Sequence, residues 1–308
     1  MKSFDLVQPT TLKDALSARR ATWLAGGSDL LPLMKTGLAD PARLVDVRGV
    51  PGLRSVRERG TMLEVGAAVT LAELLEDPRV QRRYPALAEA IAQTATPQIR
   101  NRATIGGNAR QAPRCLHYRS GLACAASGGE GCPARDGDSE QLAVLGAPEA
   151  GCATVHPSDP AVALAAYDAR LVLAAKGGAR RLPITRLSEA RGLITAIELP
   201  SPPPGARGAY VKAKDRSAFA FALASAAAVL VVKRGRVAYV RLALGGVAPR
   251  PWRAERAEAA LLGQPATPET FAAAAELELA SARPLAGSGY KVLLARNIMI
   301  RALETAKA

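Results

Sequence analysis

The sequence contains no apolar run close to the ~18 residues that a membrane-spanning helix needs. Its first residues, MKSFDLVQPTTLKDAL, also lack the basic-then-apolar order of a signal peptide. We therefore expect no membrane span, and either a cytoplasmic protein or one exported to the periplasm together with a partner. Aromatic residues make up only 4% of the chain, so Val, Leu, Ile and Ala must form its hydrophobic cores.

Acidic residues are in the minority, because 27 Asp and Glu face 41 Lys and Arg, for a formal net charge of +14. A basic excess indicates either a solvated surface or an acidic partner. The basic residues are spread along the chain, and few aromatic residues are present to stack on bases. These features disfavour nucleic-acid binding and favour an acidic partner subunit.

The length of 308 residues predicts two or three domains. Residues 1–200 alternate short apolar runs with helical stretches, which is typical of an α/β fold. The run Ser201-Pro202-Pro203-Pro204-Gly205 is the best linker, because consecutive prolines stiffen the chain and interrupt a sheet. Beyond it, the pattern predicts a separate α+β domain with a three-stranded antiparallel sheet plus helices. The predicted strands span residues 210–214, 226–232 and 237–244, and the predicted helices span residues 251–262, 268–282 and 290–307.

The nucleotide-binding patterns G-x-G-x-x-G and GK[ST] are absent. Two shorter glycine loops are present instead, at residues 24–31 (LAGGSDLL) and 104–108 (TIGGN). Paired glycines permit positive φ and let the backbone approach a ligand closely, and the N–H groups beside them attract an anion. One such loop is often purely structural, but two in the same region predict a clamp for a pyrophosphate.

Residues 156–159 (HPSD) stand just before a helix expected from residue 159 to 167. Ser158 or Asp159 suits the N-cap of this helix, and Pro160 suits its first turn. Capping alone is a sufficient explanation. The functional alternative makes Asp159 an acceptor for a ligand hydroxyl or amine, and the sequence leaves both open.

Only four cysteines are present, and all of them lie close together in the sequence, at Cys115, Cys124, Cys132 and Cys152. Their spacing lacks the C-x2-C pairs of common zinc sites. Two disulfides would require an oxidising compartment, and so large a chain does not need them. Four thiolates are the full ligand set of a 4Fe-4S cluster. The pattern favours an iron–sulfur cluster and leaves a zinc site as the alternative.

These motifs together resemble the flavoprotein subunits of the xanthine dehydrogenase and carbon monoxide dehydrogenase family. The two glycine loops and HPSD occur in the family's order, followed by residues 210–216 (YVKAKDR) and 245–251 (GGVAPRP). The match covers essentially the whole chain and is far more specific than any one motif. It implies a two-lobed FAD-binding region of the vanillyl-alcohol-oxidase/PCMH type over residues 1–200, with lobes at about 1–55 and 56–200. Residues 206–308 would form the C-terminal flavoprotein domain.

The resemblance also implies which residues contact FAD. In the family, the first glycine loop and the TIGGN loop hold the FAD pyrophosphate, and later positions add further contacts. No catalytic residue is implied on this chain, and His117 and His156 are expected to be structural or, for His117, to lie near a cluster. The implied FAD-binding residues are Leu24, Ala25, Gly26, Gly27, Ser28, Asp29, Leu30, Leu31, Thr104, Gly107, Asn108, Gln111, Asp159, Ile194 and Lys212.

The cysteine-rich insert at residues 109–152 narrows the resemblance to the periplasmic-type aldehyde oxidoreductases. Their flavin subunit holds a 4Fe-4S cluster on cysteines arranged like Cys115, Cys124, Cys132 and Cys152, and family members without the cluster lack the insert. Residues 186–194 depart from the family pattern, since this stretch is short and lacks the usual aromatic pair. The identity of the final electron acceptor therefore stays open.

The implied function is electron transfer within a heterotrimeric molybdenum hydroxylase. Partner subunits would carry the molybdenum cofactor and two 2Fe-2S clusters, and electrons would pass through FAD on this chain to an external acceptor. One alternative is a stand-alone flavin oxidase, which would need a substrate base near the flavin. Another is a zinc-stabilised binding module, which a colourless chain with stoichiometric zinc would indicate.

Overall fold

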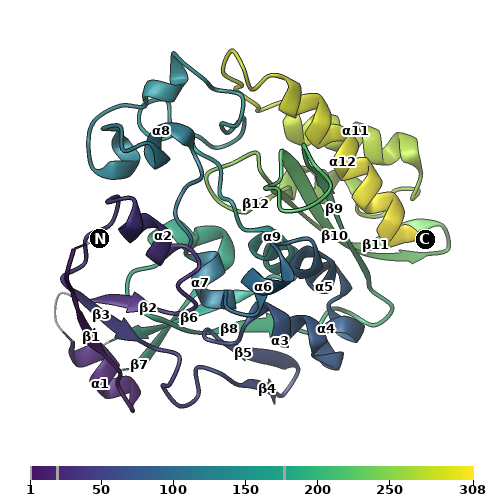
Figure 1. Cartoon of the computed structure of the whole chain (residues 1–308). Helices are drawn as coiled ribbons and strands as arrows, with labels where there is room; N and C mark the ends of the chain where they lie inside the picture. The colour runs from purple at the N-terminus through teal and green to yellow at the C-terminus, as the bar shows by residue number, and fades with distance from the viewer. Residues whose placement is uncertain (1, 19–20, 176–177) are drawn as a thin grey trace. The chain divides into compact units, whose positions relative to one another are not determined.

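The structure is a computed structural model of the chain (Figure 1) and describes residues 2–18, 21–175 and 178–308. The chain folds into two compact units, each assembled from three separate segments. No helix in these three ranges is both long enough and apolar enough to cross a membrane. The first unit comprises Met1–Asp77, Thr96–Ala112 and Asp168–Ser201. The second comprises Pro78–Ala95, Pro113–Tyr167 and Pro202–Ala308.

The first unit begins with a small parallel sheet in the order β1-β3-β2. Parallel neighbours cannot be joined by a tight turn, and the helices α1 and α2 lie in the connections. Thr11 caps α1, because its hydroxyl accepts the Asp14 N–H at 3.1 Å. The elements are β1 (Asp5–Val7), α1 (Leu12–Ser17), β2 (Thr22–Leu24), α2 (Leu30–Lys35) and β3 (Arg43–Asp46).

The larger sheet of the first unit has the order β4-β5-β8-β6-β7, and each neighbouring pair is antiparallel. The α/β arrangement expected for residues 1–200 therefore holds only for the small sheet, and the unit is a mixed α and β structure. Local periodicity identifies a strand but does not reveal its partner. The strands are β4 (Val56–Arg59), β5 (Met62–Gly66), β6 (Arg170–Ala175), β7 (Gly178–Pro183) and β8 (Ile194–Pro200). The helical segments are α3 (Leu71–Glu76), α6 (Pro97–Arg100), α7 (Ile105–Ala109) and the 3-10 helix η3 (Ile184–Glu189).

The second unit contains an antiparallel sheet of four strands in the order β12-β11-β10-β9, where the sequence predicts three. The additional strand, β12 (Trp252–Arg253), pairs with Ala243 and Leu244. The helix predicted from residue 251 is wrong at its start, because α10 begins only at Glu255. Two residues after a proline are too few to show strand alternation, so the pattern did not reveal β12. The longer strands are β9 (Arg207–Ala213), β10 (Ala224–Lys233) and β11 (Arg236–Gly245).

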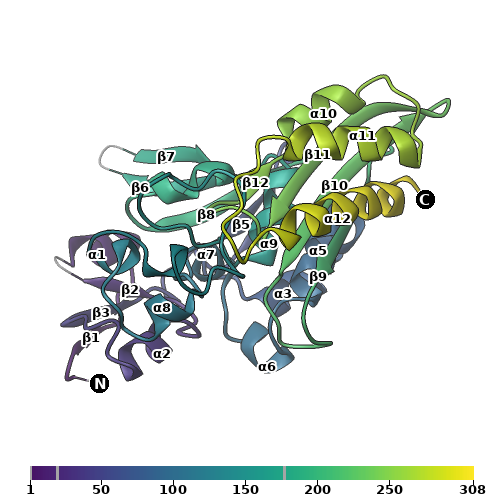
Figure 2. The same ribbon diagram turned by 90° about the horizontal axis from the view of Figure 1, so that it is seen from above.

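Helices cover both faces of this sheet. Eight consecutive residues of β10 are buried, a pattern that requires packing on both sides of a strand. The C-terminal helix α12 and the internal helix α9 both pack against β10 (Figure 2). The helices are α4 (Pro78–Arg83), α5 (Pro85–Ala92), α8 (Leu116–Arg119), α9 (Asp159–Ala166), α10 (Glu255–Leu261), α11 (Pro268–Leu279) and α12 (Tyr290–Lys307). Two 3-10 turns complete the unit, η1 (Ala125–Ser127) and η2 (Pro133–Arg135).

A buried carboxylate joins α10, α11 and β12. Ala254, the residue before α10, offers no side-chain cap, so the first N–H groups of the helix need another acceptor. Glu278 of α11 provides it: its Oε2 accepts the N–H groups of Arg256 and Ala257 at 3.0 and 3.1 Å. Its Oε1 accepts the indole N–H of Trp252 at 2.8 Å, and Glu278 is only 2% exposed. One side chain thus satisfies three donors.

We expect Glu278→Ala to lower the free energy of unfolding by about 2–4 kcal/mol, because three buried or half-buried donors lose their acceptor. The matched control is Glu276→Ala on the same helix, where the carboxylate is exposed and pairs with Arg296 at the surface. That change should lower the free energy of unfolding by at most about 1 kcal/mol. Urea unfolding followed by circular dichroism measures both. Equal losses in the two variants would contradict the capping role.

Candidate functional site

The first glycine loop connects β2 to α2 in the first unit. A Cβ atom at Gly26 would lie 1.9 Å from the carbonyl oxygen of Arg102, far inside any allowed contact. Gly27 has a φ of +74°, which residues with a side chain rarely adopt. Both glycines are therefore required locally, the first for close approach and the second for backbone conformation.

The second glycine loop starts at Thr104, whose hydroxyl accepts the Gly107 N–H at 3.1 Å and caps α7. A Cβ at Gly106 would lie 2.7 Å from the Cβ of Ala67, so this glycine is required by packing. Asp29 is the N-cap residue of α2, but its side chain makes no capping hydrogen bond there. Its Oδ2 instead accepts the N–H of Ala112 at 2.7 Å.

Both loops face one cavity of ≈ 430 Å³ in the first unit. Ile194, at the start of β8, also lines it. The structure thus brings together most of the sequence-predicted residues from three distant segments. Leu24, Leu31 and Asn108 belong to the same loops but do not line the cavity. The predicted residues that do line it are Ala25, Gly26, Gly27, Ser28, Asp29, Leu30, Thr104, Gly107, Gln111 and Ile194.

The cavity wall also contains residues that sequence reasoning missed, among them Trp23, Arg110 and Gly192. Arg110 follows the TIGGN loop by only two residues, but it belongs to no motif. Its chain neighbours gave no indication that its side chain would reach the cavity. Proximity to a predicted loop was the single available signal.

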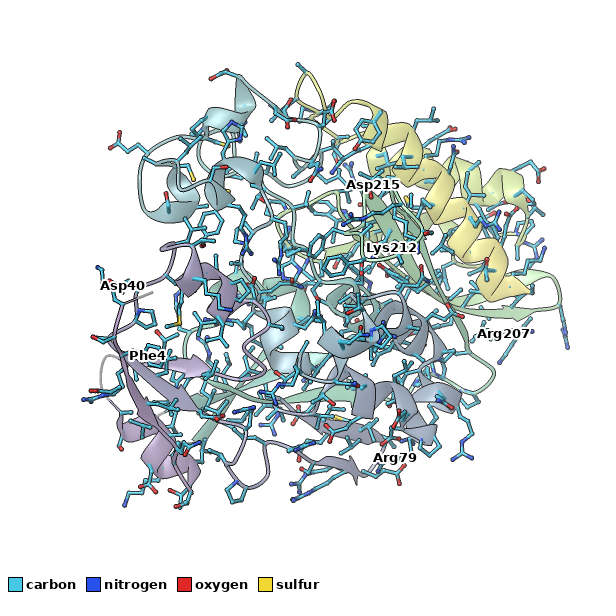
Figure 3. The ribbon with its side chains drawn as sticks, viewed as in Figure 1. Phe4, Asp40, Arg79, Arg207, Lys212 and Asp215 are labelled. Atoms are coloured by element: carbon cyan, nitrogen blue, oxygen red, sulfur yellow. The ribbon has the colours of Figure 1, made fainter. Side chains whose placement is uncertain are left out.

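The other two predicted FAD contacts, Asp159 and Lys212, lie in the second unit, where Figure 3 labels Lys212 on β9. They form a buried ion pair, with Nζ of Lys212 at 2.7 Å from Oδ2 of Asp159 and the two side chains 0% and 6% exposed. The hydroxyl of Tyr210 donates to Oδ1 of Asp159 at 2.6 Å. Burial raises the pKa of Asp159 above its usual value, against the opposing charge of Lys212.

Ser158 and Asp159 of the HPSD motif have different structural roles. Ser158 is the N-cap of α9, because its hydroxyl accepts the Ala161 N–H at 3.1 Å. Asp159 does not act as the cap and is instead the first residue of the helix, where its carboxylate meets Lys212. His156 accepts a hydrogen bond from the N–H of Ser158 at 3.4 Å, so its visible role is structural.

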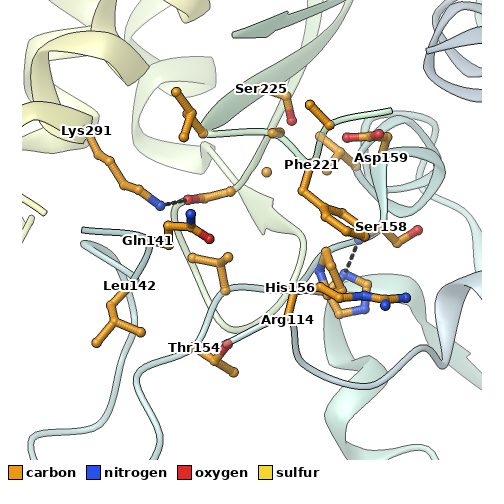
Figure 4. Close-up of a pocket in the computed structure, with 18 of the residues that line it drawn as sticks. Arg114, Gln141, Leu142, Thr154, His156, Ser158, Asp159, Phe221, Ser225 and Lys291 are labelled. Carbon is orange, nitrogen blue, oxygen red and sulfur yellow. Dashed lines mark hydrogen bonds between the residues drawn. The ribbon is translucent and has the colours of Figure 1, made fainter. Parts of the chain in front are cut away.

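A second cavity, of ≈ 200 Å³, lies within the second unit beside Asp159 (Figure 4). Figure 4 shows Lys291 of α12 extending to its edge, where the ammonium donates to the carbonyl oxygen of Gly246 at 2.8 Å. Lys291 is 1% exposed, and burial lowers its pKa to about 8. The hydroxyl of Ser225 is also buried at this cavity and has no hydrogen-bond partner in the described part of the chain.

All four cysteines are free thiols in the second unit, and they line a single small cavity together with His117. Cys115 and Cys132 pack on a small apolar cluster of Ala134, Leu142 and Ala153. Burial is the largest cause that raises the pKa of Cys152, and the nearby charges of the other three cysteines raise it further. Among the described residues, no group of three or more His, Cys, Asp or Glu side chains is placed to hold a single metal ion.

Two known families match the chain. A family described as the FAD binding domain in molybdopterin dehydrogenase matches residues 2–202, and the carbon monoxide dehydrogenase flavoprotein C-terminal domain matches residues 209–306. Together they cover nearly the whole chain.

Individual known proteins and a solved structure also match the chain over nearly its full length. The chain is 37% identical to the aldehyde oxidoreductase FAD-binding subunit PaoB of Escherichia coli (strain K12), over 100% of this chain and 99% of that protein. It is 32% identical to the carbon monoxide dehydrogenase medium chain of Hydrogenophaga pseudoflava, over 94% and 90%. A carbon monoxide dehydrogenase structure from that organism superposes with a TM-score of 0.78 at 30% identity, over 99% and 98%. The chain therefore belongs to the family of FAD-binding subunits of molybdenum hydroxylases, and it is an oxidoreductase subunit.

Proposed function

We propose that this chain is the FAD- and 4Fe-4S-binding electron-transfer subunit of an aldehyde or xanthine dehydrogenase-like molybdenum hydroxylase. In this proposal its FAD lies between the 2Fe-2S clusters of one partner subunit and an external acceptor, and another partner carries the molybdenum cofactor. The observation that carries the proposal is the single cavity onto which both glycine loops open. The similarity to PaoB, an aldehyde oxidoreductase subunit, supports the choice of substrate class.

The cavity of the first unit suits the diphosphate end of FAD. Gly26 and Gly27 line this cavity and carry no side chains, so their backbone lets a phosphate group approach closely. Ile194 supplies apolar contact. Asp159 and Lys212 are proposed as further FAD contacts, and residues 1–200 as a two-lobed FAD-binding region of the PCMH type. When bound, FAD supplies the electron-carrying chemistry, while the protein holds and orients it.

The four cysteines suit a 4Fe-4S cluster, which takes four thiolate ligands. The support is that widely spaced positions in a loop-rich segment converge on one small cavity, with no other cysteine in the chain. His117 lines the same cavity and is placed to contact the group that occupies it. A basic net charge of +14 fits docking on acidic partner subunits, either in the cytoplasm or after joint export to the periplasm.

Gly26→Ala tests the flavin site. The new methyl group overlaps the carbonyl of Arg102, so the loop must shift, and strain of about 1–3 kcal/mol corresponds to a loss of FAD affinity of roughly 5- to 100-fold. The measurement is flavin released per chain, together with the FAD dissociation constant. The control is Gly49→Ala, because a Cβ there meets nothing within 4 Å. Full flavin retention in Gly26→Ala would contradict this use of the loop.

Iron and sulfide analysis tests the cluster. Purified anaerobically with its partners, the complex should contain about four irons and four sulfides per chain beyond the partners' 2Fe-2S content. Cys124→Ser should remove most of this extra iron and leave the flavin in place. Ser120→Ala, an exposed position of the same segment, should retain both. Flavin without extra iron, or stoichiometric zinc in its place, would reject the cluster but leave the flavoprotein assignment intact. A folded complex without flavin would reject the proposed function.

A further inference from the structure

The cavity of the first unit is lined by two charged side chains of opposite sign, Asp29 and Arg110. The diphosphate of FAD is an anion, so a carboxylate in the same cavity would oppose its binding. Backbone N–H groups offset part of that negative charge. Because desolvated like charges repel strongly, an anion beside Asp29 also requires a cation, and Arg110 is the cation that lines this cavity.

The position of Arg110 in the fold directs it to the same wall as the glycines. It is the C-cap residue of α7 and follows Gly107 by three residues and Gly106 by four, so these positions share one face of the helical turn. Its Nη1 donates to the carbonyl oxygen of Ala190 at 2.7 Å. A guanidinium has five N–H donors in a planar fork, so this bond leaves others to meet phosphate oxygens.

The surroundings of Arg110 are electropositive. It forms no ion pair with any residue in the described ranges. Although the side chain stays exposed, partial desolvation lowers the pKa of its guanidinium, and the nearby positive charge of Arg191 lowers it further. Two neighbouring arginines favour the arrival of an anion.

We propose that Arg110 binds the diphosphate of FAD and offsets its charge against Asp29. This inference deepens the proposed function and rests on FAD occupying the cavity of the first unit. Arginine and phosphate form paired, charge-assisted hydrogen bonds, which would fix the diphosphate between the two glycine loops. The bond to the Ala190 carbonyl then holds the guanidinium in a fixed orientation.

The test compares FAD with riboflavin, which has the same ring but no diphosphate. On the full chain stripped of flavin, Arg110→Gln should weaken FAD binding roughly 10- to 100-fold, as expected for the loss of a charged hydrogen bond. Riboflavin binding should change by less than about twofold, since no charge is involved. Arg110→Lys should give an intermediate loss, because it keeps the charge but not the fork. Flavin fluorescence titrations measure all three.

Salt dependence provides a second measurement. Added salt should weaken FAD binding more steeply in the wild type than in Arg110→Gln, while Arg57→Gln, on the outer strand β4, should match the wild type. Unchanged FAD affinity in Arg110→Gln, equal losses for FAD and riboflavin, or equal salt slopes would each overturn the assignment of Arg110. A wild-type chain that binds no FAD would instead overturn the proposed function itself.

Discussion

The site of the first unit depends on how closely two backbones approach one another. Gly26 lies against the carbonyl of Arg102 at a distance that excludes any side chain, and Gly106 lies similarly close to Ala67. The first contact brings the loop after β2 against the segment before α7, and the second brings α7 against the residue that follows β5. The bond from the Ala112 N–H to Asp29 also ties the loop after β2 to the segment that follows α7. The cavity exists because three sequence-distant segments meet there without intervening side chains.

The second unit supplies donors to the carboxylates that it buries. Glu278 accepts three N–H donors, and Asp159 has both Lys212 and Tyr210. Breaking one member of such a pair leaves the other desolvated and uncompensated, which costs far more than the pair contributes. Lys291 differs, since its ammonium donates to one backbone carbonyl and burial lowers its pKa to about 8. A buried amine with a lowered pKa gives up its proton at a lower pH than an exposed lysine does.

The cysteine-rich segment shows how a loop can be organised without long helices. Short turns and helices of three or four residues separate the four thiols. A small apolar cluster packs against two of them, Cys115 and Cys132. An apolar core of this size stabilises little by itself. A bound inorganic group would add the cross-links that such a segment lacks, which is the physical reason to expect the segment and its ligand to fold together.

The sequence by itself determined the local features. Ser158 caps α9, as its position before the helix predicts, and the paired glycines mark the loops that line the cavity. The motif order also identified the family, which the comparisons confirmed. Which residues carry FAD and a cluster stays a prediction.

Tertiary structure decided what depends on long-range pairing. It placed β8 between β5 and β6, added β12 to the second sheet, and put Asp159 and Lys212 in a different unit from the glycine loops. It also turned Arg110 toward the cavity, although no motif includes that residue. Capping and glycine conformations arise within a few neighbouring residues, so the sequence shows them directly. Strand partners and cavity walls are set by packing between distant segments, which local patterns do not encode.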